Sequence, residues 1–229
     1  MKLFVSLPEN RVDLARAAAA EGADALKVHM NVEHRASGTT FGTFAEEKDA
    51  VLRIIEAVDC PVGLMPGSSV ESLPTAEELT SLHAAGLQFL DIYARHMPTW
   101  FIDLPHDLIV ALDRFSGFVE EPFYLTHLFW PPGRSSTRIS MCEASIFSPE
   151  EYGQPFTYFD WRQLRILQEY ADAPLLVPTQ KRITPDDARW LARTGTGGLM
   201  IGAVVTGRDA ESIAAATAEY RKAIDEVAD

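Results

Sequence analysis

Four ionisable side chains within short apolar runs could carry acid–base chemistry: Lys27, His29, Asp91 and Glu143. In the run DALKVHMN, residues 24–31, the lysine and the histidine alternate with apolar residues, so a strand would place both on one face. Charges that share a buried interior must pair, and such surroundings tune a lysine or a carboxylate for proton transfer or for imine formation with a carbonyl. These residues predict an active site wherever the fold brings them together.

Short apolar or β-branched runs alternate with amphipathic helical patterns along the chain. Such alternation is typical of parallel β/α units. We expect strands over residues 2–8, 24–31, 60–67, 87–98, 122–130, 138–147, 174–180 and 197–207. We expect helices over residues 9–23, 45–59, 74–86, 103–115, 157–173, 184–195 and 209–227.

Eight strands are the number that closes a (β/α)8 TIM barrel, a fold of about 250 residues. The chain has 229 residues and no dividing linker or repeat, so we expect an α/β fold with a single barrel domain over residues 1–229. Between residues 122–130 and 138–147 one crossover helix is either missing or replaced by a loop; alternatively, residues 107–113 are a strand and the order shifts by one unit. A doubly wound open sheet competes, but it usually has a glycine-rich turn after its first strand, and VSLPENR contains no glycine.

In a barrel the active site lies at the C-terminal ends of the strands and in the loops that follow. The outer face of each strand packs on helices and is apolar. This alternation directs Lys27, His29 and Asn31 into the barrel from one strand. It directs Asp91 and Arg95 inward from another, so both signs of charge meet in the interior.

Two later strands are expected to add His127 and Glu143 to this interior. A glutamate at a strand end is hard to place against an apolar helix, so we assign Glu143 inward. The stretch HRASGTTFGTF, residues 34–44, is rich in glycine and threonine and has no period, which is typical of a functional loop. We expect it to form a lid over the site.

The composition limits the partners of the chain. Its net charge of −13 and isoelectric point near 4.9 argue against nucleic acid or an anionic membrane surface as the main partner. Two cysteines are too few for a disulfide framework or a cysteine zinc cluster. The sequence shows no signal-peptide pattern and no run of about 20 apolar residues. We expect a cytoplasmic protein with a small-molecule partner and no cofactor, and a homo-oligomer remains open.

The most informative segment lies near the C-terminus and reads LLVPTQKRITPDDARWLARTGTGGLMIGAVVTGRDAESI. The backbone N–H groups of Gly202 and Ala203, followed by a short helical turn, would form an anion cradle. Loops after strands 7 and 8 hold phosphate in many barrels. We expect Thr179 and Lys181, at the end of the preceding strand, to add a hydroxyl group and a positive charge to this site.

The segment from Leu175 to Ile224 resembles the phosphate-binding TIM barrels of the ribulose-phosphate-binding type, such as N-acylmannosamine-phosphate epimerases and geranylgeranylglyceryl phosphate synthases. MCEASIF, residues 141–147, looks like the glutamate-bearing strand of the glyceryl phosphate synthases. The resemblance implies a barrel enzyme that acts on a small phosphorylated metabolite. Together with the interior lysine and carboxylates, it favours a lyase, an aldolase or an isomerase of a phosphorylated carbonyl compound.

Two other functions fit the same residues. His29, His127 and Glu143 would suit a metal-dependent hydrolase, because a catalytic zinc takes three protein ligands and a water. The zinc motif HExxH is absent, so we expect no metal site. Alternatively, the chain is a non-catalytic binding or scaffold protein in which Lys27 forms a structural ion pair with Asp91 or Glu143.

Overall fold

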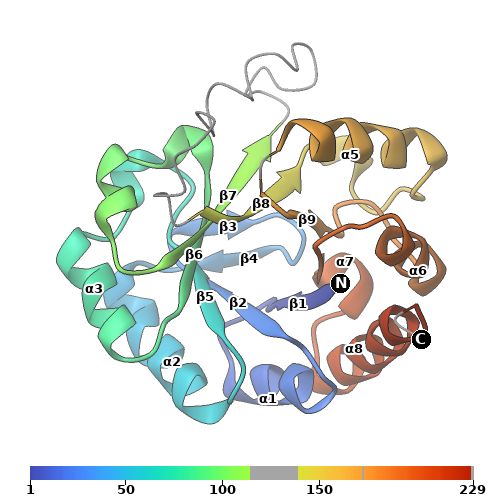
Figure 1. Ribbon diagram of the computed structural model, residues 1–229. Helices are drawn as coiled ribbons and strands as arrows, with labels where there is room; N and C mark the ends of the chain where they lie inside the picture. The colour runs from blue at the N-terminus through green and yellow to red at the C-terminus, as the bar shows by residue number, and fades with distance from the viewer. Residues whose placement is uncertain (114–138, 172, 228–229) are drawn as a thin grey trace.

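The computed structural model describes residues 1–113, 139–171 and 173–227. The strands of the main sheet are β1 (Lys2–Ser6), β2 (Ala25–His29), β5 (Val62–Met65), β6 (Phe89–Tyr93), β7 (Asp107–Asp113), β8 (Ile139–Ser145), β9 (Leu175–Pro178) and β10 (Gly198–Ile201). They are parallel and close into a barrel in the order β1, β10, β9, β8, β7, β6, β5, β2 (Figure 1). The chain therefore forms a (β/α)8 TIM barrel, as the sequence predicts.

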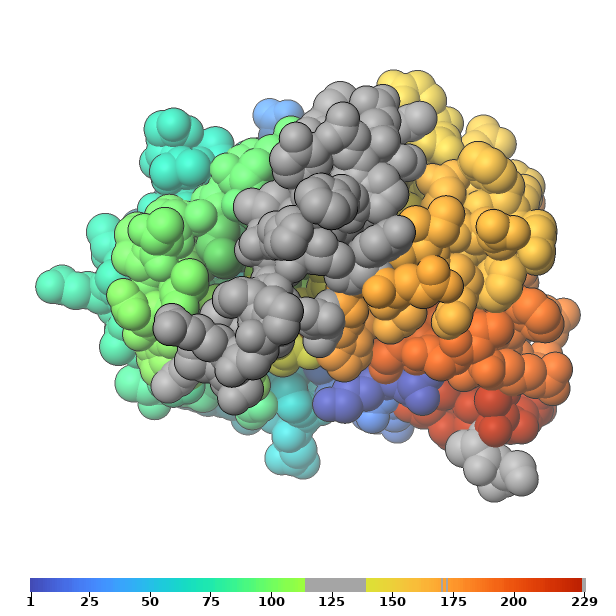
Figure 2. Space-filling view, turned by 45° about the horizontal axis from the view of Figure 1, so that its top comes forward, coloured from blue at the N-terminus to red at the C-terminus, as the bar shows by residue number. Residues whose placement is uncertain are grey.

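Helices surround this barrel on the outside (Figure 1). They are α1 (Val12–Ala20), α2 (Phe44–Ala57), α3 (Ala76–Ala84), α5 (Tyr158–Tyr170), α6 (Pro185–Arg193), α7 (Ala203–Thr206) and α8 (Ala210–Asp225). Figure 2 shows α5, α6 and α8 one after another along one side of the molecule, from yellow through orange to red. In the described part of the chain, no helix is both long enough and apolar enough to cross a membrane.

Threonines define where three of the outer helices begin. Thr75, Thr157 and Thr184 each accept a hydrogen bond from the backbone N–H three residues later, where an acidic side chain completes the capping box. Each cap satisfies N–H groups that would otherwise lack a partner at the helix start. The caps thereby set the lengths of the loops that lead from the barrel strands into α3, α5 and α6.

The barrel interior is apolar toward the N-terminal ends of the strands. This apolar layer consists of Phe4, Ala25, Phe89, Ile109, Met141, Leu176 and Met200. Gly63 makes room for the largest of them, because a Cβ atom at this position would lie 2.1 Å from the ring of Phe89. The layer closes the lower half of the barrel, so only the upper half is free for polar groups.

Two predicted elements require correction. The predicted helix over residues 103–115 is wrong: residues 107–113 form β7, which pairs with β6 and β8. Its apolar run is buried on both faces, and a continuous apolar run does not distinguish a helix from a buried strand by its period. The predicted strand over residues 122–130 lies outside the described residues.

The crossover from β6 to β7 lacks an α-helix, whereas the segment where the sequence predicts a missing crossover helix, residues 131–137, lies outside the described residues. Between β6 and β7, residues 94–106 contain the 3₁₀ helices η2 (Ala94–His96) and η3 (Thr99–Asp103) and no α-helix. This arrangement agrees with the alternative in which the strand order shifts by one unit.

The predicted lid is a β-hairpin. Strands β3 (Val32–His34) and β4 (Thr39–Phe41) pair antiparallel outside the barrel sheet. Gly38 has a φ of +67°, a left-handed conformation that favours glycine in the connecting turn. The hairpin is tied to the end of β2 by a hydrogen bond from Asn31 N–H to Gly42 O at 2.8 Å.

Candidate active site

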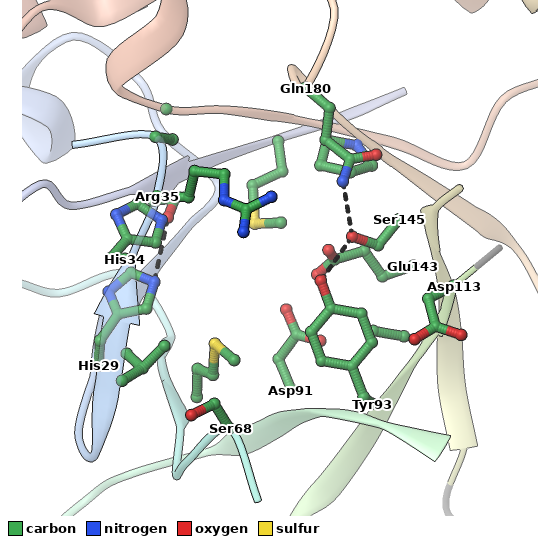
Figure 3. Close-up of a pocket in the computed structure, with 18 of the residues that line it drawn as sticks. His29, His34, Arg35, Ser68, Asp91, Tyr93, Asp113, Glu143, Ser145 and Gln180 are labelled. Atoms are coloured by element: carbon green, nitrogen blue, oxygen red, sulfur yellow. Dashed lines mark hydrogen bonds between the residues drawn. The ribbon is translucent and has the colours of Figure 1, made fainter. Parts of the chain in front are cut away.

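A pocket of about 390 Å³ opens at the C-terminal ends of the barrel strands (Figure 3). Its lining includes residues from all eight barrel strands and from the β3–β4 hairpin. In Figure 3, His29 and His34 face the central space from one side, and Tyr93 and Ser145 face it from the other. Parallel barrels place their active sites at this end.

Lys27 lies at the floor of this pocket between two carboxyl groups. Its Nζ donates to Asp91 Oδ2 at 2.8 Å and to Glu143 Oε2 at 3.1 Å. The three side chains are nearly buried, with exposures of 8%, 2% and 6% for Lys27, Asp91 and Glu143. Each lies two residues after a member of the apolar layer, so strand alternation explains its inward direction.

The three groups control one another's protonation. Burial raises the pKa of Glu143 well above its ordinary value, and the nearby carboxyl group of Asp91 raises it further. Burial alone would lower the pKa of Lys27, but Asp91 and Glu143 outweigh burial and raise it above its ordinary value. The floor therefore combines a charged ammonium with two carboxyl groups, of which Glu143 holds its proton more readily than an ordinary glutamate.

His29 faces the pocket from the end of β2. Its Nε2 lies 3.4 Å from Ser6 Oγ, and its ring stacks on Phe41 and packs on His34 at centroid distances of 4.8 and 4.5 Å. Burial lowers the pKa of His29 well below its ordinary value, and His34 and Lys27 lower it further. Burial, with a contribution from Lys27, also lowers the pKa of His34 to about 4. Both imidazoles are neutral near pH 7, which suits hydrogen bonding rather than charge neutralisation.

A chain of hydrogen bonds forms another wall of the pocket. Tyr93 Oη lies 2.8 Å from Ser145 Oγ, which accepts from Gln180 Nε2 at 2.9 Å. Gln180 Nε2 also donates to Tyr152 Oη at 2.7 Å, and Gln180 Oε1 accepts from Phe147 N–H at 3.2 Å. We call Tyr93, Ser145, Tyr152 and Gln180 the hydroxyl wall.

Three of the residues predicted to bind phosphate lie together beside the pocket. Thr179 and Gly202 line it, and Gly202 N–H donates to Thr179 Oγ1 at 3.1 Å. Ala203 follows Gly202 as the first residue of α7. The predicted anion cradle therefore differs from the expectation: the N–H group of Gly202 already donates to Thr179, so it is not free to bind a phosphate.

Lys181 does not line the pocket. Its Nζ lies 3.3 Å from Glu151 Oε1 and 3.4 Å from Asp160 Oδ1, and only 9% of its side chain is exposed. The chain turns after β9, so Gln180 faces the pocket in place of Lys181. Through these two carboxylates Lys181 links η4 (Pro149–Glu151) to α5, and its charge is neutralised there. Lys181 therefore does not have the role at the phosphate that the sequence predicts.

Three further predicted residues lie elsewhere than expected. Asn31 has a left-handed φ of 52°, and its amide donates to Pro66 O at 3.0 Å, so it turns the chain from β2 into β3 and does not line the pocket. Arg95 belongs to η2, where its Nη2 lies 2.6 Å from Asp113 Oδ2 at the pocket rim. With 48% of its side chain exposed, Arg95 is not an interior group. His127 lies outside the described residues.

Several polar lining residues were not predicted as site residues from the sequence, among them His34, Arg35, Tyr152 and Gln180. His34 and Arg35 come from the hairpin, whose strands are too short for an alternating pattern to be recognised. Tyr152 lies in a loop after η4, where no period exists. Gln180 is the last residue of a predicted strand. A polar side chain at the C-terminal end of a barrel strand was the signal that could have identified it as a pocket residue.

The geometry gives no support for a metal centre among the residues that the structure describes, where no three His, Cys, Asp or Glu side chains are grouped to hold an ion. The alternative of a hydrolase also requires His127, which is outside these residues. Its other members, His29 and Glu143, both line the pocket, and Glu143 is occupied by Lys27.

No family model and no curated protein matches the chain. Among solved structures, thiamine phosphate pyrophosphorylase from Pyrococcus furiosus is 18% identical with a TM-score of 0.63, and the match covers 99% of this chain and 96% of that one. Tryptophan synthase from M. tuberculosis is 14% identical with a TM-score of 0.68, covering 97% and 92%. A 3-hexulose-6-phosphate synthase is 15% identical with a TM-score of 0.66, covering 98% and 100%. At these identities the likeness establishes the barrel fold over nearly the whole chain.

Proposed function

We propose that the protein is an enzyme that moves a proton next to the carbonyl group of a small phosphorylated metabolite, as an isomerase or as a lyase of the aldolase kind. The observation that carries this proposal is the position of Lys27 Nζ between Asp91 and Glu143 at the pocket floor. Proton transfer next to a carbonyl needs a base and an acid whose pKa values are pushed apart by their surroundings. At this floor the raised pKa of Glu143 favours the acid, and Asp91, which shares Lys27 Nζ with it, is the proposed base.

Each of the three groups has a distinct role in the proposal. Asp91, as a carboxylate, removes the proton from the carbon beside the carbonyl. Glu143 is the carboxyl group that keeps its proton, because its pKa is raised, and it returns a proton to the neighbouring atom. The Lys27 ammonium balances the negative charge. In the proposal the proton passes back from Asp91 to Glu143 between turnovers, since both carboxyl groups contact Lys27 Nζ, at 2.8 and 3.1 Å.

Lys27 is better suited to charge balance than to imine formation. A lysine must be neutral to attack a carbonyl. Here two carboxyl groups raise its pKa above the ordinary value, so the neutral amine is scarce at neutral pH. Acid–base chemistry at Asp91 and Glu143 needs no such deprotonation.

Thr179, Gly202 and Ala203 form the proposed phosphate end of the pocket. Because Thr179 Oγ1 accepts from Gly202 N–H, its own hydroxyl proton remains for a ligand. Gly202 has no side chain, and a Cβ atom there would approach no other residue closer than 3.5 Å, so a ligand can come near the backbone. Fold likeness to a thiamine phosphate pyrophosphorylase and a 3-hexulose-6-phosphate synthase supports a phosphorylated substrate.

Matched ligands test this proposal. Thermal unfolding is measured with dihydroxyacetone phosphate, ribulose 5-phosphate and fructose 6-phosphate, each against its dephosphorylated counterpart. A ligand that binds the folded protein raises the unfolding temperature, and at a fixed concentration the rise is larger for a tighter ligand. We expect at least one phosphorylated compound to stabilise the protein more than its counterpart does, and Gly202→Ala to remove that difference without lowering the unfolding temperature of the free protein. Equal shifts for every pair would contradict a phosphate site.

A further inference from the structure

The proposed function leaves the hydroxyl wall without a role. Ser145 and Gln180 are 5% and 6% exposed, yet both line the pocket together with Tyr93 and Tyr152. The wall stands beside the floor, because Tyr93 and Ser145 lie two residues after Asp91 and Glu143 on β6 and β8. A ligand above Lys27 would therefore meet it.

The direction of each hydrogen bond in the wall follows from Gln180. Its Oε1 accepts from the backbone N–H of Phe147, which can only donate. The amide nitrogen therefore faces the other way, and its two hydrogens go to Ser145 Oγ and Tyr152 Oη. Both hydroxyl oxygens are acceptors in these bonds.

Two hydroxyl protons of the wall have no acceptor among the described residues. Tyr152 accepts from Gln180, and its own proton has no acceptor among the described residues. One proton lies between Tyr93 and Ser145, whichever of them donates it, so the second proton of that pair is also unused in this part of the chain. Burial raises the pKa of both tyrosines, so both keep their protons at neutral pH. Two hydroxyl donors are thus left beside the floor.

We propose that Tyr152 and the Tyr93–Ser145 pair form an oxyanion hole for the enolate of the substrate, with Gln180 as the residue that positions them. This inference rests on the proposed function. When Asp91 takes the proton from carbon, the electron pair of the C–H bond forms a C=C bond and the carbonyl oxygen becomes negative; the reverse shift occurs when Glu143 returns a proton. Preorganised donors aimed at such an oxygen stabilise it more than the neutral carbonyl.

The test uses two ligands of similar size that share a phosphate. Phosphoglycolohydroxamate carries the planar oxyanion of an enediolate, whereas glycerol 3-phosphate carries none. Their affinities are measured by calorimetry for the wild-type protein, Tyr152→Phe and Gln180→Glu. A carboxylate at position 180 can still accept from Phe147 N–H, but it draws the protons of Ser145 and Tyr152 toward itself.

We expect the wild-type protein to bind the hydroxamate more tightly than glycerol 3-phosphate. Both variants should weaken hydroxamate binding by at least about tenfold and leave glycerol 3-phosphate binding within about twofold, since one oxyanion donor is worth this much or more. A purely structural role of the wall would weaken both ligands alike, and that result, or no change in either, would overturn the oxyanion hole while the proposed function stands. If the wild-type protein binds neither compound, the oxyanion hole is overturned, and the matched phosphorylated ligands in the unfolding measurements decide the proposed function.

Discussion

The ammonium of Lys27 lies 2.8 Å from Asp91 Oδ2, although 64 positions separate the two residues in the sequence. They come from β2 and β6, which lie on either side of β5 in the barrel. The contact spans the intervening strand β5, and it places opposite charges where the side chains are 8% and 2% exposed. Its energetic and chemical consequences can each be measured.

Replacing Lys27 by Met should destabilise the protein by about 3–5 kcal/mol, because two carboxyl groups would be left buried without their cation. Unfolding in urea measures this loss. The control is Lys2→Met, which removes an exposed lysine from β1 and should change the stability little. Adding Asp91→Asn and Glu143→Gln to Lys27→Met should restore much of the stability. If Lys27→Met and Lys2→Met changed the stability equally, the two buried carboxyl groups would not depend on the Lys27 charge.

Glu143 should make the stability depend on pH in a defined direction. Its pKa is raised in the folded protein, so the carboxyl group supports folding fully below its unfolded pKa of about 4.3 and loses that support as the pH rises through the folded value. The free energy of unfolding of Glu143→Gln should therefore improve relative to the wild type between acid and neutral pH. A constant difference across this range would show that Glu143 titrates normally.

His34 should act in the opposite sense. Its pKa is lowered to about 4 in the folded protein, whereas an unfolded histidine titrates near 6.5. The neutral side chain supports folding fully above about 6.5, and this support is lost as the pH falls toward the folded value. The His34→Gln protein should therefore lose less stability than the wild type between these two pH values, as chemical unfolding at each pH would reveal. Parallel losses would argue that the histidine is solvated.

Two glycines inside the barrel should respond differently to the same substitution. A Cβ atom at Gly63 would lie 2.1 Å from the Phe89 ring, but one at Gly202 would come no closer than 3.5 Å to its neighbours. Gly63→Ala should destabilise the protein by about 1–3 kcal/mol through overpacking, and Phe89→Leu in the same chain should relieve part of the loss. Gly202→Ala should unfold at nearly the wild-type urea concentration. Equal stabilities of the two alanine variants would mean that the apolar layer is loosely packed.

Alternation along the strands was the sequence signal that predicted which side chains line the candidate site. Lys27 and Asp91 face inward because their apolar neighbours must cover the outer face, and this holds wherever a strand has one polar face. The apolar run over residues 108–112 has no polar face. Whether it forms a helix or a strand, and which side chains face inward, followed only from its pairing with β6 and β8. Lys181 shows a second limit of sequence patterns: because the chain turns after β9, Gln180 lines the pocket and Lys181 does not.

The hairpin was also beyond the reach of sequence patterns. Its strands have three residues each, too few for a period, and its position depends on the contact of Phe41 with the buried His29 ring. The direction of side chains within a strand could thus be predicted locally. Which loop residues enter the pocket depended on contacts between distant segments.

The central claim is that Asp91 takes a proton from carbon in a ligand held above Lys27. Proton NMR in D₂O tests it by following the signal of the proton beside the carbonyl of each phosphorylated compound that binds. The account predicts that the wild-type protein exchanges this proton for deuterium, that Asp91→Asn slows the exchange by at least about 100-fold, and that Lys2→Met does not slow it. Exchange by Asp91→Asn at the wild-type rate, or no exchange of any bound phosphorylated carbonyl compound by the wild-type protein, would contradict it.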